Sequence, residues 1–180
     1  DVYKRQDEPY AAVVALFVPA AVVGAYRALS GSWWASAALA IYLGISASFY
    51  TLFTALTALT VVVLAIILAF QRRSWRPVVH LIVIGVISIL IALIAWGPYL
   101  YQRLTGGYEA RSTANHFLPA EGTVFPLPFF SLSIVGLCCL IGLIYLIARG
   151  ERDAAKALTV AIGVCYIWIL ASMVITMLRT

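Results

Sequence analysis

The chain has 180 residues, of which 64% are hydrophobic and only 11% charged, with a formal net charge of +5 at pH 7. A soluble domain covers its surface with charged side chains at roughly a quarter of its positions, so this composition excludes a soluble fold. In the bilayer core backbone groups find no water, which leaves helices or closed barrels as spanning structures. The apolar runs are continuous rather than alternating, and they predict an all-α integral membrane protein.

The ends of the chain indicate a piece of a larger protein. The sequence has no initiator Met and stops at Thr180 as an apolar segment closes. We interpret residues 1–6 as a translated sequencing-adapter tag, and we expect 7–180 to be part of a polytopic membrane domain. The mild basic balance gives no indication of nucleic-acid binding.

Six apolar segments predict membrane-spanning helices, since about 20 helical residues cross a hydrocarbon core of ~30 Å. The run from Trp33 to Phe70 is too long for one crossing, and its most polar part, Ser46 to Thr51, predicts a tight turn between two helices. The segment 102–130 predicts an ordered loop on the membrane surface. The predicted spans are about 10–26, 33–48, 51–70, 78–97, 132–148 and 157–178.

Lys and Arg residues predict which loops face the cytoplasm, where these residues are enriched. The segment Gln71–Arg76 carries three Arg and no acid, and Arg149–Lys156 carries three more cations. We expect His80, which follows the first segment, to be an interfacial residue. In this orientation, the Ser46–Thr51 turn and the loop 102–130 share the outer face of the plasma membrane.

The polar side chains of these outer segments could carry chemistry. Carboxylates bind hydroxyls or move a proton, aromatic rings stack on sugars, and cations bind a phosphate leaving group. The rings equally suit an aromatic belt, and the loop residues equally suit turns or surface ion pairs. No cluster of metal ligands occurs in the sequence. Whether the reaction uses a divalent cation therefore cannot be decided from these residues. The candidate substrate-binding residues are His116, Glu121, Arg111, Tyr50, Tyr99 and Glu8.

Four short motifs keep their order along the chain. They are Glu8-Pro9-Tyr10-Ala11-Ala12, Phe49-Tyr50-Thr51-Leu52, Trp96-Gly97-Pro98-Tyr99-Leu100 and His116-Phe117-Leu118-Pro119-Ala120-Glu121-Gly122. In these motifs the sequence resembles the galactan 5-O-arabinofuranosyltransferase family of mycobacteria and corynebacteria. The last motif, where the family has His-Tyr-Leu-Pro-Ala-Asp-Gly, is the most specific. The second and third stand where the family has Trp-Tyr-Thr-Leu and Trp-Leu-Pro-Tyr-Leu.

The resemblance implies a GT-C type glycosyltransferase with its active face outside the membrane. The implied donor is decaprenylphosphoryl arabinose, the implied acceptor is the galactan of cell-wall arabinogalactan, and the expected reaction is a direct displacement with inversion. The resemblance also implies that the catalytic Asp residues precede Glu8 and that an extracytoplasmic domain follows Thr180. We therefore assign no catalytic residue and expect this chain alone to be inactive.

Two alternatives stay open from the sequence. Another GT-C enzyme could use a different polyprenyl-phosphate sugar, because the shape of the pocket decides the substrate. A non-catalytic transporter or assembly subunit is the second. A transporter is expected to carry ionisable residues or helix breaks near the bilayer midplane. The predicted spans hold almost none of these apart from Pro19.

Overall fold

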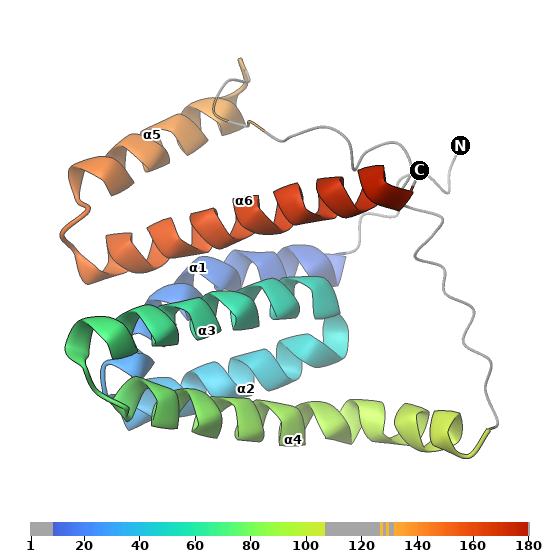
Figure 1. Cartoon of the computed structure of the whole chain (residues 1–180). Coiled ribbons are helices and arrows are strands. Elements are labelled where there is room, and N and C mark those ends of the chain that lie inside the picture. The colour runs from blue at the N-terminus through green and yellow to red at the C-terminus, as the bar shows by residue number, and fades with distance from the viewer. Residues whose placement is uncertain (1–8, 107–126, 128, 130–131, 180) are drawn as a thin grey trace. The chain divides into compact units, whose positions relative to one another are not determined.

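The computed structural model describes residues 9–106, 127, 129 and 132–179, and in this part of the chain the regular structure is helical throughout. Residues 51–72, 76–104 and 153–175 form helices long and apolar enough to cross a membrane, and three further apolar helices are shorter. This confirms the predicted all-α membrane fold. The helices are α1 (Pro9–Leu29), α2 (Trp33–Phe49), α3 (Thr51–Arg72), α4 (Arg76–Leu104), α5 (Ile134–Ala148) and α6 (Asp153–Arg179) (Figure 1).

The tight turn predicted within Ser46–Thr51 is present, but it is shorter than this segment. Helix α2 continues to Phe49 and α3 begins at Thr51, so Tyr50 alone is non-helical, with φ −148° and ψ 97°. The serine hydroxyls that suggested a longer turn donate back to carbonyls of their own helix, Ser46 to Leu43 at 3.1 Å and Ser48 to Gly44 at 3.3 Å. Their polarity is therefore satisfied within α2.

The start of the predicted loop 102–130 is wrong, because α4 continues to Leu104. The apolar run ends near Gly97, but a helix can continue into the interface, where polar side chains are solvated. Pro98 lies inside α4 near this end. It removes one backbone donor from the last turns, a loss that the end of a helix tolerates better than its middle.

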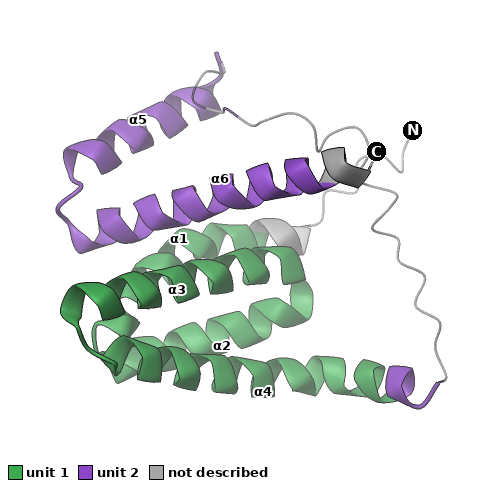
Figure 2. Ribbon diagram, viewed as in Figure 1, with its two compact units in different colours: residues 1–101 green, residues 102–180 purple. Residues whose placement is uncertain are grey.

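The chain divides into two compact units, residues 1–101 and 102–180 (Figure 2). In the second unit α5 and α6 form a helical hairpin. Ser133 starts α5 as its N-cap, and its hydroxyl accepts a hydrogen bond of 3.1 Å from the backbone N–H of Gly136. In the short connection to α6, the Arg152 guanidinium donates to the Tyr145 hydroxyl at 3.5 Å.

In the first unit, α1 to α4 run alternately in opposite directions, so their connections fall at two ends (Figure 1). At one end, the Arg72 guanidinium donates a hydrogen bond of 3.0 Å to the Ser30 hydroxyl, which joins the end of α3 to the α1–α2 connection. At the other end, the Trp96 indole Nε1 donates to the Ala47 carbonyl at 3.0 Å, which joins α4 to the end of α2. We call the first the arginine end (Arg27, Arg72, Arg73 and Arg76) and the second the aromatic end (Phe49, Tyr50, Phe53, Trp96 and Tyr99).

Helices α2 and α4 approach each other along a stripe of small residues, Ser36, Ala40 and Gly44, one on each turn of α2. The Ser88 hydroxyl on α4 lies 3.1 Å from the Ala40 carbonyl oxygen. A Cβ atom at Gly44 would lie 2.6 Å from the Cβ of Ile91, closer than two such carbons can come. Lipid gives no hydrophobic drive to helix association, so close backbone approach and interhelical hydrogen bonds hold such pairs together.

The remaining core of the first unit lies between α1, α2 and α3. Two threonines of α3 are buried there, and each hydroxyl donates to the carbonyl four residues earlier, Thr57 to Phe53 at 2.7 Å and Thr60 to Leu56 at 2.9 Å. Their burial therefore leaves no unpaired hydroxyl. The apolar residues of this core include Val22, Ala25, Ala28, Leu29, Leu39, Leu43, Val61, Leu64, Ala65 and Leu68.

Candidate functional site

The structure describes two of the six candidate residues, Tyr50 and Tyr99, and both belong to the aromatic end of the first unit. The other four, Glu8, Arg111, His116 and Glu121, lie outside the described residues, as does the segment 1–6 interpreted as a tag. The prediction that these four share one face with Tyr50 and Tyr99 therefore stays a prediction.

Tyr50 is held by its neighbours on both sides of the α2–α3 junction. Its backbone N–H donates to the Ser46 carbonyl at 2.8 Å, and its own carbonyl accepts from the Thr54 hydroxyl at 3.0 Å. The half-buried ring lies against Phe53, with the ring centroids 5.0 Å apart. Because the backbone is fixed by hydrogen bonds before and after it, the phenol of Tyr50 is presented from a rigid junction.

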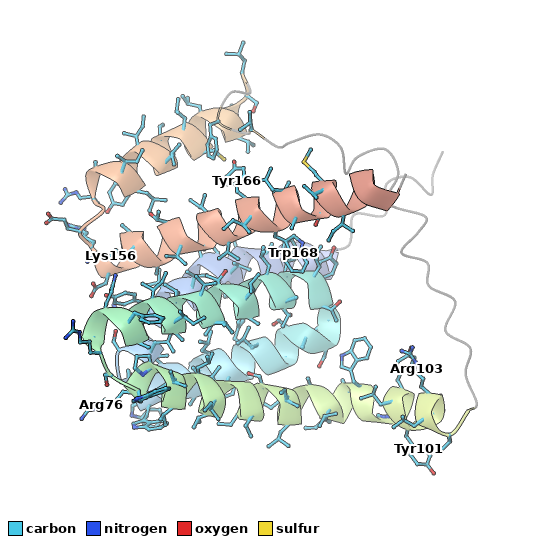
Figure 3. All side chains as sticks on the ribbon, viewed as in Figure 1. Arg76, Tyr101, Arg103, Lys156, Tyr166 and Trp168 are labelled. Carbon is cyan, nitrogen blue, oxygen red and sulfur yellow. The ribbon has the colours of Figure 1, made fainter. Side chains whose placement is uncertain are left out.

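Tyr99 is positioned through Trp96, one turn earlier on α4. The two rings meet edge to face, with centroids 5.8 Å apart and planes at 82°, which is a favoured aromatic geometry. The Trp96 indole is in turn fixed by its hydrogen bond to the Ala47 carbonyl. Two of the motifs in the sequence thus meet in space. Figure 3 shows the side chain of Tyr101 near the end of α4.

The aromatic end has no carboxylate of its own with which to move a proton. Residues 9–106 contain no Asp or Glu. Among the described residues no group of three or more His, Cys, Asp or Glu side chains could hold a metal ion. Partly exposed rings and phenol hydroxyls suit contacts with a sugar face and its hydroxyls. Any general base has to come from another segment.

His80, which we expected at the interface, is buried within the first unit, with 5% of its surface exposed. Its Nδ1 lies 2.8 Å from the Ser36 hydroxyl oxygen, and its ring stacks on Trp33 with centroids 4.1 Å apart. A signal for this was present in the sequence. His80, Ile84 and Ser88 repeat every four residues, as Ser36, Ala40 and Gly44 do on the facing helix.

Comparison with known proteins matches the chain to a family of arabinofuranosyltransferases. Residues 2–180 match the family model described as arabinofuranosyltransferase N terminal. A galactan 5-O-arabinofuranosyltransferase of Corynebacterium glutamicum is 49% identical over 175 residues, which cover 97% of this chain and 26% of the relative.

Mycobacterial relatives are more distant but cover the same part of the chain. A galactan 5-O-arabinofuranosyltransferase of Mycolicibacterium smegmatis is 38% identical over 179 residues, covering 96% of this chain and 29% of the relative. One of Mycobacterium tuberculosis is 35% identical over 184 residues, with the same two shares. The chain therefore spans between 26% and 29% of the length of these relatives.

Proposed function

Because this chain belongs to the arabinofuranosyltransferase N-terminal family, we propose that it is part of the membrane domain of an enzyme that transfers arabinofuranosyl groups to galactan. The observation that carries this proposal is the similarity of nearly the whole chain to enzymes named for that reaction, at up to 49% identity. The rigid aromatic end supports it, because it combines exposed rings with hydroxyls at one end of a helical bundle. A transporter is less well supported, since the relatives are named as transferases.

The proposed donor is decaprenylphosphoryl arabinose, and the proposed enzyme is of the GT-C type. A carboxylate from outside residues 9–106 removes the proton from a galactan hydroxyl as its oxygen attacks the anomeric carbon. The bond from that carbon to the lipid phosphate breaks, and the phosphate leaves with the electron pair. The aromatic end orients the sugars, and His116, Glu121 and Arg111 bind the donor phosphate or the acceptor. Glu8 is the fourth polar contact in this proposal.

We place the aromatic end at the outer face of the plasma membrane and the arginine end in the cytoplasm. The support is the enrichment of Arg in cytoplasmic loops together with the position of Arg27, Arg72, Arg73 and Arg76 at one end of the first unit. The test uses the full-length protein in spheroplasts, with its native cysteines replaced by serine and one cysteine added at Thr105 or Gln71. An impermeant maleimide should label T105C in intact spheroplasts and Q71C only after lysis. The reverse pattern would overturn the orientation.

The activity is tested with the full-length protein in reconstituted membranes. Decaprenylphosphoryl arabinose and a galactan oligosaccharide are supplied, and the transfer of labelled arabinose is measured. Transfer to the oligosaccharide supports the proposal. A preference for a polyprenyl-phosphate mannose donor would favour the alternative of another GT-C enzyme. Absence of transfer from every lipid-linked sugar would overturn the enzymatic assignment.

A further inference from the structure

A second polar site lies at the arginine end of the first unit, where the α1–α2 and α3–α4 connections meet. A cleft of about 460 Å³ opens there, which is within the usual size of small-molecule pockets, about 300–1,000 Å³. Its walls are the side chains of both connections and of the first turns of α2 and α4. They include Gly31, Trp33, Ser74, Trp75, Arg76 and His80.

The imidazole of His80 lines this cleft and is held in place by its neighbours. Its Nδ1 is 2.8 Å from the Ser36 hydroxyl oxygen and its ring stacks on Trp33, so it cannot turn away. Within the described residues every fully buried side-chain nitrogen and oxygen has a hydrogen-bond partner, and no partner is found for Nε2 of His80. This nitrogen is therefore not fully enclosed, and His80 lines the cleft.

The Ser36 hydroxyl can determine which ring nitrogen of His80 carries the hydrogen. The Ser36 hydroxyl has one hydrogen to donate and two acceptors in reach, the Ser32 carbonyl at 3.1 Å and His80 Nδ1 at 2.8 Å. When Ser36 donates to Nδ1, a neutral His80 carries its hydrogen on Nε2 and offers it to the cleft. An acceptor oxygen in the cleft selects this arrangement.

Arg76 supplies a second donor on the same wall. It precedes His80 by one turn of α4, so the two side chains share one face of the helix. The Arg76 backbone N–H donates to the Ser74 hydroxyl at 3.3 Å, which sets the start of α4 beside the cleft. A planar guanidinium with several N–H groups matches the oxygens of a phosphate. The cleft thus combines a guanidinium, an imidazole and a serine hydroxyl.

Among the described residues of the first unit, no carboxylate side chain balances the charge at this end. Four arginines gather there, and residues 9–106 contain no Asp or Glu. Arg72 donates to a neutral hydroxyl, Ser30, rather than to a carboxylate. The exposed indoles of Trp33 and Trp75 flank the cleft, and indoles prefer the headgroup level of a membrane. Basic pockets between helices at this level are suited to lipid headgroups.

We propose that this cleft binds a phosphate ester, the group carried by the headgroup of an anionic phospholipid, between Arg76, His80 and Ser74. This site is separate from the aromatic end and independent of the proposed transfer reaction. At about 1.5 Å per helical residue, Arg76 and Trp96 stand roughly 30 Å apart along α4.

The test uses the full-length protein purified in a neutral detergent and titrated with phosphatidylglycerol, with binding followed by native mass spectrometry. Arg76→Gln should weaken binding by at least about tenfold, as expected for the loss of a charge-assisted hydrogen bond. Arg103→Gln, at the other end of the same helix, should bind as the parent protein does. Equal losses in R76Q and R103Q, or no loss in R76Q, would overturn the proposal, because general attraction to anionic lipid would then explain binding.

A second measurement identifies the source of the phosphate. Inorganic phosphate that displaces phosphatidylglycerol at millimolar concentration supports a site for a free phosphate, and failure to displace it supports a lipid headgroup. Diacylglycerol, which has the same tails without the phosphate, should not bind at this site. Binding of diacylglycerol that is as tight as that of phosphatidylglycerol and equally sensitive to R76Q would overturn the phosphate assignment. His80→Gln should weaken the binding of phosphatidylglycerol as R76Q does. Retained transfer activity in this variant shows that it is folded.

Discussion

The indole nitrogen of Trp96 donates a hydrogen bond of 3.0 Å to the carbonyl oxygen of Ala47. Ala47 lies in the last turn of α2, where carbonyls have no intrahelical partner, so Trp96 acts as a cap supplied by another helix. The same contact brings Tyr99 on α4 beside the junction that holds Tyr50. The aromatic end therefore depends on one hydrogen bond between segments far apart in the sequence.

If the full-length protein catalyses the proposed transfer, replacement of Trp96 by Phe should lower kcat/KM for that transfer about fivefold. The reason is that a net hydrogen bond of about 1 kcal/mol is lost and the Ala47 carbonyl is left without its partner. Transfer kinetics with a galactan oligosaccharide measure the effect. Trp34→Phe is the matched control, because Trp34 is 89% exposed and should be insensitive. Equal kinetics for W96F and the parent enzyme would contradict the role given to this contact.

Tyr99 should act through its ring if the aromatic end orients a sugar. Tyr99→Ala should raise KM for the galactan acceptor about three- to tenfold, the range expected for loss of an aromatic contact. Tyr99→Phe keeps the ring and should stay within about twofold of the parent enzyme. The two variants are compared by steady-state transfer at varied acceptor concentration. Equal increases in KM for both would assign the role to the hydroxyl instead.

His116 is a candidate from the sequence alone, and a substitution tests its role although it lies outside the described residues. His116→Ala in the full-length enzyme should lower kcat/KM about tenfold if the imidazole binds the donor phosphate or the acceptor, because a charge-assisted hydrogen bond is lost. Thr105→Ala, just after α4, serves as a control on the same segment. An unchanged transfer rate and KM in H116A would remove His116 from the site.

Gly44 should be the position on α2 least tolerant of a side chain. Gly44→Ala places a Cβ 2.6 Å from that of Ile91 and should destabilise the protein by about 1–3 kcal/mol, as overpacking does. Gly85→Ala on α4 is the control, because a Cβ there meets nothing within 4 Å. Alanine is also the better helix former, by up to about 1 kcal/mol. In detergent, the unfolding temperature should fall in G44A and rise in G85A. A change in the same direction for both variants would contradict the α2–α4 packing.

Arg73 ends α3 in the left-handed region, with φ 47° and ψ 42°, a conformation that glycine adopts without strain. Arg73→Gly should therefore stabilise the protein by about 1 kcal/mol. Arg72→Gly, one residue earlier and still helical, should instead destabilise it by about the same amount. The unfolding temperatures of the two variants measure the difference. A loss of stability in R73G would show that the arginine side chain outweighs the backbone strain.

The sequence by itself determined which segments of the described residues are helical, although not where every helix ends. Each of the six apolar segments must satisfy its backbone internally in lipid, which is a local requirement. The placement of arginines at one end of the first unit was also predictable, because alternate connections of antiparallel helices return to the same end. The serines of α2 were misleading, since a hydroxyl can serve a turn or bond back within a helix, and composition does not distinguish the two.

Only the tertiary structure decided which faces meet. The small residues of α2 and the residues of α4 that face them both repeat every four positions, so several registers are compatible with the sequence. Steric fit selects the register in which Gly44 meets Ile91 and Ser36 meets His80. That register buries a histidine expected at the interface and brings Trp96 to Ala47. The backbone hydrogen bonds of a helix depend only on the residues of that helix. Close packing between helices depends on the side chains of every helix that takes part in the contact.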